Sequence, residues 1–211
     1  MRKEISITIL FLMTCITVFS QQNRKFDEIE KQEFEQKIVE NSQKIATLQC
    51  TFVQEKTSSL FVEKAVAKGI LSYQSPSMLR WEYTEPSPST LIINGNDAIL
   101  LDRDGNKMGN EKMLKQLGGI IISMINGSGI VQNRQFSSEL YPIDHAQILV
   151  VLTPLQKRLK DFYTQIELTI DLRTMLAHEI LLVEVSGDKM VIFLTNKVLN
   201  SDFSQNIFAI K

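Results

Sequence analysis

Alternating hydrophobic and polar residues mark the stretch 69–104 as a series of β-strands. Three segments alternate with a period of two and are bounded by Pro, Ser, Asn or Gly: residues 70–73, 78–83 and 91–93. The pair Asn94-Gly95 is typical of a tight hairpin turn, whose central positions need a positive φ. Residues 91–94 are therefore predicted to fold back antiparallel onto residues 98–102. Pro76 and Pro86 fall in turns, where a missing N–H removes no hydrogen bond from the sheet.

The middle strand separates its side chains by face, because successive residues of a strand point to opposite sides. The two faces carry Leu79, Trp81 and Tyr83 on one side, and Met78, Arg80 and Glu82 on the other. The first face is apolar and aromatic, so it is expected to point into the protein. Its simplest interpretation is a filled hydrophobic core, and the alternative is the wall of a binding cavity.

A long amphipathic helix is predicted before this sheet, over residues 27–48. Its apolar residues recur at near-helical spacing, with Glu, Lys and Gln between them: Ile29, Phe34, Ile38, Ile45 and Leu48. At Leu48 the period changes to two, so a first strand is expected to start there almost without a loop. A polar connection at residues 56–61 then leads into a strand over residues 62–73.

Residues 109–129 are the least strand-like part of the second half. Their apolar residues form a helical stripe: Met113, Leu117, Ile121, Met124 and Ile125. Gly118 and Gly119 interrupt that stripe at a cost of about 1 kcal/mol each relative to alanine. A glycine-interrupted apolar helix is expected to be a mobile lid, with hinge candidates at Gly118, Gly119, Gly127 and Gly129. The alternative is a buried helix packed permanently on the sheet.

Five further strands are predicted along the rest of the chain, over residues 130–136, 147–153, 162–171, 177–185 and 189–197. The total is ten or eleven strands and two or three helices, without a repeat or a linker rich in Gly or Pro. The predicted fold class is α+β, with a single antiparallel sheet. A sheet with that many strands must curve strongly to bury its apolar face.

The composition describes one ordinary globular domain: 211 residues, a net charge of −1, 44% hydrophobic and 22% charged residues. No basic excess indicates a nucleic-acid partner. Residues 1–20 carry Arg2 and Lys3 before an apolar run that ends at Phe19, as in a cleavable signal peptide. That run is shorter than the roughly 20 residues of a membrane-spanning helix. Residues 21–211 are therefore expected to form a soluble exported domain, with a lipidated Cys15 as the alternative.

Motifs of catalytic and metal sites do not occur in the sequence. The two histidines, His145 and His178, stand in isolated positions, and Cys50 lies in an alternating strand without a nearby His. Cys50 is expected to be a buried small hydrophobe, and as the single thiol after the signal it has no disulfide partner. Residues 102–106 resemble a fragment of a calcium loop but lack its closing glutamate, so a turn is expected. We expect no catalytic residue, metal or cofactor.

Short motifs follow one another in a characteristic order after the amphipathic helix. They are Leu48-x-Cys50-x-Phe52-x-Gln54-x-Lys56, Gly69-x-Leu71-x-Tyr73, Ser75-Pro76, Leu79-Arg80-Trp81-x-Tyr83-x-x-Pro86, Ile93-Asn94-Gly95 and Leu152-Thr153-Pro154. In this order, and in an exported chain of this size, they resemble the LolA family. Members of that family are periplasmic carriers that take lipoproteins from the inner to the outer membrane.

The resemblance implies an unclosed, strongly curved barrel with helices across its mouth and a hydrophobic cavity between sheet and helices. It implies acylated lipoproteins or lipids as ligands, an inner-membrane lipoprotein-releasing transporter as donor and an outer-membrane acceptor. It also implies a periplasmic monomer that acts without a cofactor. The residues expected to hold the acyl chains are Phe52, Leu71, Tyr73, Leu79, Trp81, Tyr83, Leu91 and Ile93 from the sheet, and Ile121, Met124 and Ile125 from the lid.

One position departs from the family pattern. Better-known members carry an arginine directly before the proline of the strand turn, where it ties sheet to lid, and this chain has Ser75 there. Arg80 is close in sequence, but the alternation of the strand points it away from Trp81. Two functions of different classes therefore stay open: a lipoprotein carrier, and a lipid- or peptide-binding sensor or interaction module of the same half-barrel fold. An enzyme is the third.

Overall fold

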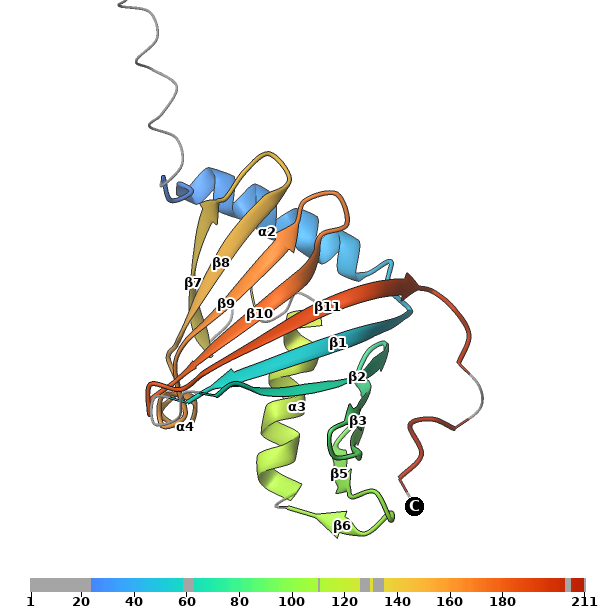
Figure 1. Cartoon of the computed structure of the whole chain (residues 1–211). Coiled ribbons are helices and arrows are strands. Elements are labelled where there is room, and N and C mark those ends of the chain that lie inside the picture. Colours follow the sequence, from blue (N-terminus) through green and yellow to red (C-terminus); the bar gives the residue numbers. More distant parts are fainter. Residues whose placement is uncertain are drawn as a thin grey trace, which may run out of the picture.

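One curved antiparallel sheet dominates the computed structural model of the chain (Figure 1), which describes residues 24–58, 63–109, 111–125, 130, 135–203 and 206–210. The described residues form eleven strands and three helices, which confirms the predicted α+β class with a single unclosed sheet. The strands are β1 (Thr47–Thr57), β2 (Ala65–Gln74), β3 (Met78–Glu85), β4 (Ser89–Asn94), β5 (Asp97–Leu101), β6 (Lys107–Met108), β7 (Phe136–Pro142), β8 (Gln147–Pro154), β9 (Tyr163–Asp171), β10 (Leu176–Glu184) and β11 (Lys189–Leu199). The helices are α2 (Glu28–Ser42), α3 (Glu111–Ile125) and α4 (Lys157–Lys160).

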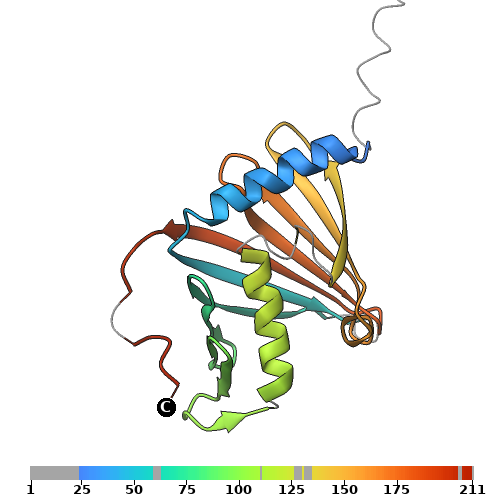
Figure 2. The same cartoon turned by 180° about the vertical axis from the view of Figure 1, so that it is seen from behind.

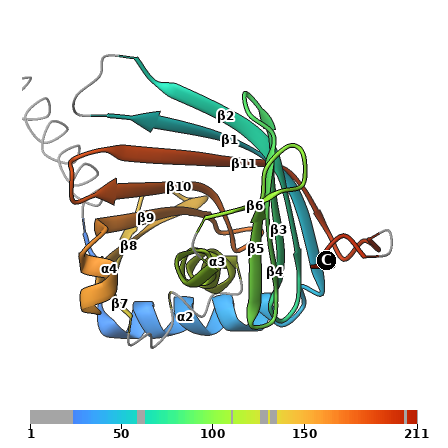
Figure 3. The same ribbon diagram turned by 90° about the horizontal axis from the view of Figure 1, so that it is seen from below.

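The strand order joins the two ends of the domain at the centre of the sheet. It runs β6-β5-β4-β3-β2-β1-β11-β10-β9-β8-β7. A first meander, β1–β6, and a second meander, β7–β11, therefore meet where β1 pairs with β11. The two outer strands, β6 and β7, flank α3 in the chain. The connection between them carries α3 into the space enclosed by the curved sheet, where Figure 3 shows the helix end-on.

Helix α2 lies across the strands of the second meander (Figure 2). Its first turn is fixed by a capping box: Asp27 Oδ1 accepts hydrogen bonds from the backbone N–H groups of Ile29 and Glu30, at 3.0 and 2.9 Å, and Glu30 Oε2 accepts from Asp27 N. The helix buries Phe34 and Ile38. Lys31 Nζ near its start donates to Ser138 O of β7, and Asn41 Nδ2 near its end donates to Thr174 O in the turn between β9 and β10, both at 3.0 Å.

The predicted end of this helix at residue 48 is wrong, since α2 stops at Ser42. Ile45 and Leu48 are buried, but Leu48 belongs to β1, where it pairs with Tyr73 of β2 and Leu199 of β11. The spacing of Ile45 and Leu48 therefore continues the helical period by coincidence. The polar connection predicted at 56–61 also starts too early, because β1 continues to Thr57.

Helix α3 is continuous through Gly118 and Gly119, so the predicted interruption is wrong. Gly118 lies directly on Ile93 of β4: a Cβ added to it would be 1.5 Å from Ile93 Cδ1. Gly119 faces open space, with nothing within 4 Å of an added Cβ. The first glycine thus allows a close approach of helix and sheet, which explains its presence without a break in the helix. The side chains of Met113 and Leu117 lie outside the described residues.

The strand predicted at residues 130–136 begins only at Phe136 and continues to Pro142. Ile130 is buried in a turn, and residues 131–134 lie outside the described residues. The register with β8, which pairs Phe136 with Pro154 and Pro142 with Ile148, sets the length of β7. The strand has Ser and Glu at its outward positions and a proline at its end, so its sequence lacks the usual pattern of a strand.

Candidate functional site

An apolar cavity of about 310 Å³ lies between helix α3 and the concave face of the sheet. Its walls come from both meanders and from the second half of the helix. The described lining residues are Gln54, Trp81, Tyr83, Leu91, Leu100, Ile120, Ile121, Met124, Tyr163, Ile180, Leu182, Met190 and Ile192. Most of these side chains are aliphatic or aromatic, so the cavity suits a hydrocarbon ligand.

Strand alternation explains why these side chains point inward together. Leu182 and Ile180 are two residues apart on β10, as are Met190 and Ile192 on β11, so each pair shares one face. The register of β10 with β11 places Leu182 opposite Met190 and Ile180 opposite Ile192. The same arrangement holds in the first meander, where Trp81 pairs with Leu91.

The volume of the cavity sets the size of a ligand that fits without rearrangement. An engineered cavity of about 150 Å³ in another protein holds one benzene molecule, which has six carbon atoms. A cavity of about 310 Å³ therefore accommodates roughly a dozen carbon atoms. This is less than one long acyl chain, so a larger lipid requires the helix to move away from the sheet.

Five of the eleven predicted contact residues line this cavity: Trp81, Tyr83, Leu91, Ile121 and Met124. Five others are buried side chains of the surrounding core: Phe52, Leu71, Tyr73, Leu79 and Ile93. Ile125 lines a second, smaller cavity instead. Of the hinge candidates, Gly118 and Gly119 lie in the middle of α3, and Gly127 and Gly129 lie outside the described residues.

Eight lining residues were missed by the sequence analysis: Gln54, Leu100, Ile120, Tyr163, Ile180, Leu182, Met190 and Ile192. Five of them belong to β9, β10 and β11, and these strands were predicted correctly apart from small shifts of the ends. The pairing of β1 with β11, which joins these strands to the first half of the sheet, has no signal in the local pattern. Alternation predicts two faces for each strand, but only that pairing tells which face is interior.

An aromatic cluster forms the wall of the cavity at β1 and β3. Phe52 packs against Trp81, with ring centroids 4.5 Å apart, and meets Tyr83 edge-on at 5.3 Å. Gly69 on β2 makes room for this arrangement, since a Cβ there would lie 2.0 Å from Glu82 O and 2.5 Å from Phe52 Cζ. The absence of a side chain at Gly69 therefore allows Phe52 to lie behind the two rings that face the cavity.

Polar groups gather at one place on the cavity wall. Tyr83 Oη donates a hydrogen bond to Gln54 Oε1 at 2.9 Å. Burial raises the pKa of the Tyr83 phenol, and the neighbouring Trp81 indole and Gln54 amide partly oppose that rise. Trp81 Nε1 lies near enough to this phenol to affect its pKa, but the two atoms do not meet the geometry of a hydrogen bond, and the buried indole N–H has no other partner among the described residues. Burial also raises the pKa of the Tyr163 phenol elsewhere on the wall.

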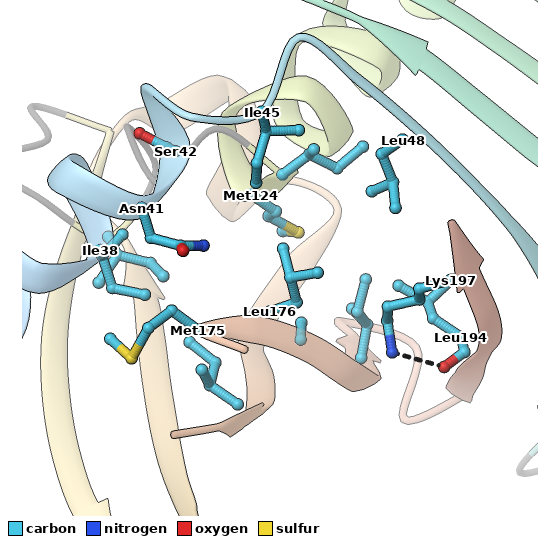
Figure 4. A pocket seen from close by; sticks show the side chains of 15 residues that line it. Ile38, Asn41, Ser42, Ile45, Leu48, Met124, Met175, Leu176, Leu194 and Lys197 are labelled. Atoms are coloured by element: carbon cyan, nitrogen blue, oxygen red, sulfur yellow. Dashed lines mark hydrogen bonds between the residues drawn. The ribbon is translucent and has the colours of Figure 1, made fainter. Parts of the chain in front are cut away.

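The second cavity, of about 30 Å³, lies where α2 and the end of α3 meet the sheet (Figure 4). Its polar side chains already have partners: Asn41 donates to Thr174 O, Ser42 Oγ donates to Val39 O, and Lys197 Nζ donates to Leu194 O at 2.8 Å. Burial lowers the pKa of Lys197. A volume this small holds about two water molecules, so this cavity is a gap in packing rather than a site for an acyl chain.

Groups with reactive chemistry are not assembled in the part of the chain that the structure describes. Cys50 is a free, buried thiol, and burial raises its pKa to about 11. His145 is exposed and His178 is half-buried on β10. No three His, Cys, Asp or Glu side chains among the described residues are placed to hold a metal ion. Residues 102–106 form the expected turn, in which Asp102 accepts hydrogen bonds from Asp104 N and Asn106 N.

Ser75, at the position where better-known family members carry an arginine, lies in an exposed turn. Ser75 follows β2, and its backbone N–H donates to Ala46 O, away from α3. Arg80 points to the outer face, as predicted: its Nε donates to Glu82 Oε2 at 2.8 Å and its Nη1 to Ile207 O at 3.3 Å. Arg80 therefore holds the carboxy-terminal segment against the back of β3 and does not connect the sheet to the helix.

None of the helices among the described residues combines the length and the apolar character needed to cross a membrane. The described chain begins at Arg24, just before α2 (Figure 1). The predicted signal at residues 1–20, including Cys15, lies outside the described residues.

Comparison with known proteins places this architecture in a family. The family model of the outer membrane lipoprotein carrier protein LolA matches residues 43–211. No curated protein sequence matches the chain.

A LolA superfamily protein of Nitrosomonas europaea superposes with a TM-score of 0.50 at 13% identity, over 83% of this chain and 97% of that chain. An uncharacterised conserved protein of Thermus thermophilus gives a TM-score of 0.51 at 9% identity, over 85% and 93%. At such identities the structures support the fold alone, but the family match covers most of the sequence, and the chain belongs to the LolA family.

Proposed function

We propose that this protein is a soluble periplasmic carrier that binds the acyl chains of lipoproteins and takes them from the inner to the outer membrane. The observation that carries the proposal is the apolar cavity of about 310 Å³ beneath α3, in a chain of the LolA family. An inner-membrane lipoprotein-releasing transporter would supply the cargo, and an outer-membrane acceptor would receive it. The function requires no bond chemistry, and hence neither a cofactor nor a catalytic residue.

Binding of a whole acyl chain would displace α3 from the sheet. The helix buries Ile120, Ile122 and Met124, which are each less than 10% exposed. Burying one such side chain stabilises a structure by about 1.5–3 kcal/mol, so displacement of the three costs on the order of 5–9 kcal/mol. An acyl chain with about 14 methylene groups gains about 11 kcal/mol on leaving water. The surplus of a few kcal/mol is enough for binding and small enough for later release.

A flexible lid surface supports this exchange. Met124 lies on α3 and Met190 on β11, and both line the cavity. The unbranched thioether of methionine repacks readily against differently shaped partners. The two side chains can thus pack against neighbouring residues in the empty protein and against acyl chains in the loaded one.

The test uses the single tryptophan of the chain, Trp81, which lines the cavity. A fatty acyl chain that carries bromine atoms quenches indole fluorescence on close contact. We expect saturable quenching of Trp81 by a brominated acyl ester, and a shift of its emission to shorter wavelength with the unbrominated ester. Native mass spectrometry of the protein purified from its own cell envelope would then identify the bound acylated peptide or lipid.

Two variants near the end of β10 provide a matched comparison. Leu182→Phe puts a larger side chain into the cavity, whereas Val185→Phe places the same side chain at a position that is 55% exposed. Quenching should weaken in the first variant and stay unchanged in the second. If brominated chains leave the fluorescence of the unmodified protein unaltered, the cavity does not bind acyl chains. The interaction module of the same fold would then be the remaining candidate.

A further inference from the structure

One polar group of the cavity lining lacks a hydrogen-bond partner among the described residues: the indole N–H of Trp81. Four of the thirteen described lining residues carry a side-chain nitrogen or oxygen, and three of these adjoin one another: Gln54, Trp81 and Tyr83. The Tyr83 hydroxyl uses its hydrogen to donate to Gln54 Oε1. Trp81 is 3% exposed, and its Nε1–H is left without an acceptor among the described residues.

A buried N–H without a partner is rare in proteins, and leaving it unpaired is unfavourable. Trp81 is held in this position on both sides, because Phe52 packs on its ring and Leu91 pairs with it on β4. The Tyr83 hydroxyl lies beside this N–H without forming a hydrogen bond to it, so a carbonyl oxygen of a ligand that displaces the surrounding side chains would supply the missing acceptor.

We propose that Trp81 Nε1–H donates a hydrogen bond to the carbonyl oxygen of an acyl ester or amide, so that the cavity prefers acyl groups to plain hydrocarbon chains. The proposal rests on the proposed function and names the ligand atom that the cavity recognises. An indole nitrogen can only donate. The ligand atom that complements it is therefore an acceptor, which excludes an ammonium group.

A neutral carbonyl fits this place better than a carboxylate does. The described lining residues include no Lys, Arg or His side chain. Lys197 lines the second cavity, and its Nζ already donates to Leu194 O. Transfer of an ionised carboxylate into an apolar cavity without a cation is strongly unfavourable. An ester or amide keeps the acceptor oxygen and brings no charge, as in the acyl groups attached to a lipoprotein or a glycerolipid.

The first experiment needs no variant. Because the chain has one tryptophan, a nitrogen–proton correlation spectrum contains a single indole N–H resonance. Methyl tetradecanoate and hexadecane are chains of similar length, and only the first has a carbonyl group. We expect the ester to move the indole proton to lower field, as hydrogen bonding does, and the alkane to leave it near its original position.

The second experiment compares affinities by displacement of a fluorescent acyl probe. One hydrogen bond changes affinity by roughly three- to tenfold, so the ester should bind that much more tightly than the alkane. Trp81→Phe should reduce this ratio to about one, chiefly by weakening the ester. Leu91→Ala removes apolar contact from the same cavity, so it should weaken both ligands and preserve the ratio.

Three results separate this inference from the proposed function. Equal affinities of ester and alkane, or an indole proton that does not move on ester binding, would overturn the role of Trp81 and leave the carrier function standing. A ratio that survives Trp81→Phe would assign the preference to another group. If neither ligand displaces the probe, the proposed function fails and the inference fails with it.

Discussion

Two adjacent glycines on α3 allow the movement of the helix to be tested by matched substitutions. Gly118→Ala and Gly119→Ala introduce the same methyl group into the same helix, one residue apart. At Gly118 the new Cβ would lie 1.5 Å from Ile93 Cδ1, and at Gly119 it would meet nothing within 4 Å. Both gain the preference of alanine over glycine for a helix, which is about 1 kcal/mol.

The two variants should therefore change stability in opposite directions. Gly119→Ala should raise the free energy of unfolding by about 0.5–1 kcal/mol. At Gly118 the same gain is opposed by overpacking against Ile93, which is 4% exposed and has little room to move. Overpacking of a core costs about 1–3 kcal/mol. The net effect of Gly118→Ala should be a loss of up to about 2 kcal/mol.

The effect of Gly118→Ala on ligand affinity depends on the conformational state in which the new methyl group clashes with Ile93. The contact of Gly118 with Ile93 is present while α3 lies on the sheet, and it would be absent once a ligand displaces the helix. A clash of about 1.4 kcal/mol in the closed state alone would raise the affinity for an acyl chain about tenfold. Gly119→Ala favours the helix equally in both states, so the affinity should stay unchanged.

Urea unfolding measures the stabilities, and quenching of Trp81 by a brominated acyl ester measures the affinities. Weaker binding by Gly119→Ala would contradict this reasoning, because a hinge at the glycine pair would then be needed for opening. An unchanged affinity in a destabilised Gly118→Ala variant would show that binding does not require α3 to leave β4.

Three other substitutions test the core and the helix start. Burial raises the pKa of the Cys50 thiol to about 11, from 9.0 for an unperturbed thiol. The free energy of unfolding should therefore fall by up to about 1.4 kcal/mol per pH unit between these two values. In urea unfolding, Cys50→Ala should abolish this dependence on pH. Gly69→Ala forces a methyl group against Glu82 O and Phe52 and should cost at least about 3 kcal/mol in the same assay, where a smaller loss would mean that β2 shifts easily. Asp27→Ala removes the acceptor of the capping box and should cost about 1 kcal/mol, with Asp27→Asn retaining most of the stability.

The sequence predicts the strands of the first meander closely because each is short, alternates cleanly and ends in a strong turn signal. Residues 78–83 fall within β3. The hairpin predicted at Asn94-Gly95 is present one residue later, because Asn94 pairs with Asp97 and the turn consists of Gly95 and Asn96, with a positive φ of 61° at Gly95 alone. The helix prediction for residues 109–129 also located α3 at Glu111–Ile125, and residues 126–129 lie outside the described residues. Its interruption was wrong because helix propensity is a local quantity, whereas the close approach of Gly118 to Ile93 is a property of the folded protein.

The cavity itself could be predicted only in part. Alternation identifies the inward face of β3, and two of its residues, Trp81 and Tyr83, line the cavity. The same rule places Leu79 on that face, yet Leu79 is fully buried in the core. Whether an inward side chain meets another side chain or a void depends on how far α3 extends along the strand. That distance is set by the packing of Gly118 and by the sheet curvature, neither of which has a pattern in the sequence.

The division of the core between the two helices explains how a protein with a cavity remains stable when the cavity opens. Val150 and Leu152 of β8, with Ile166 and Leu168 of β9, are completely buried in the second meander, which α2 crosses. Helix α3 instead contacts β3, β4, β5 and β10. Its displacement would therefore expose the side chains around the cavity while the core beneath α2 stays packed. Stability and binding are thus assigned to different parts of one sheet, so the weak attachment of α3 that release requires does not make the whole fold weak.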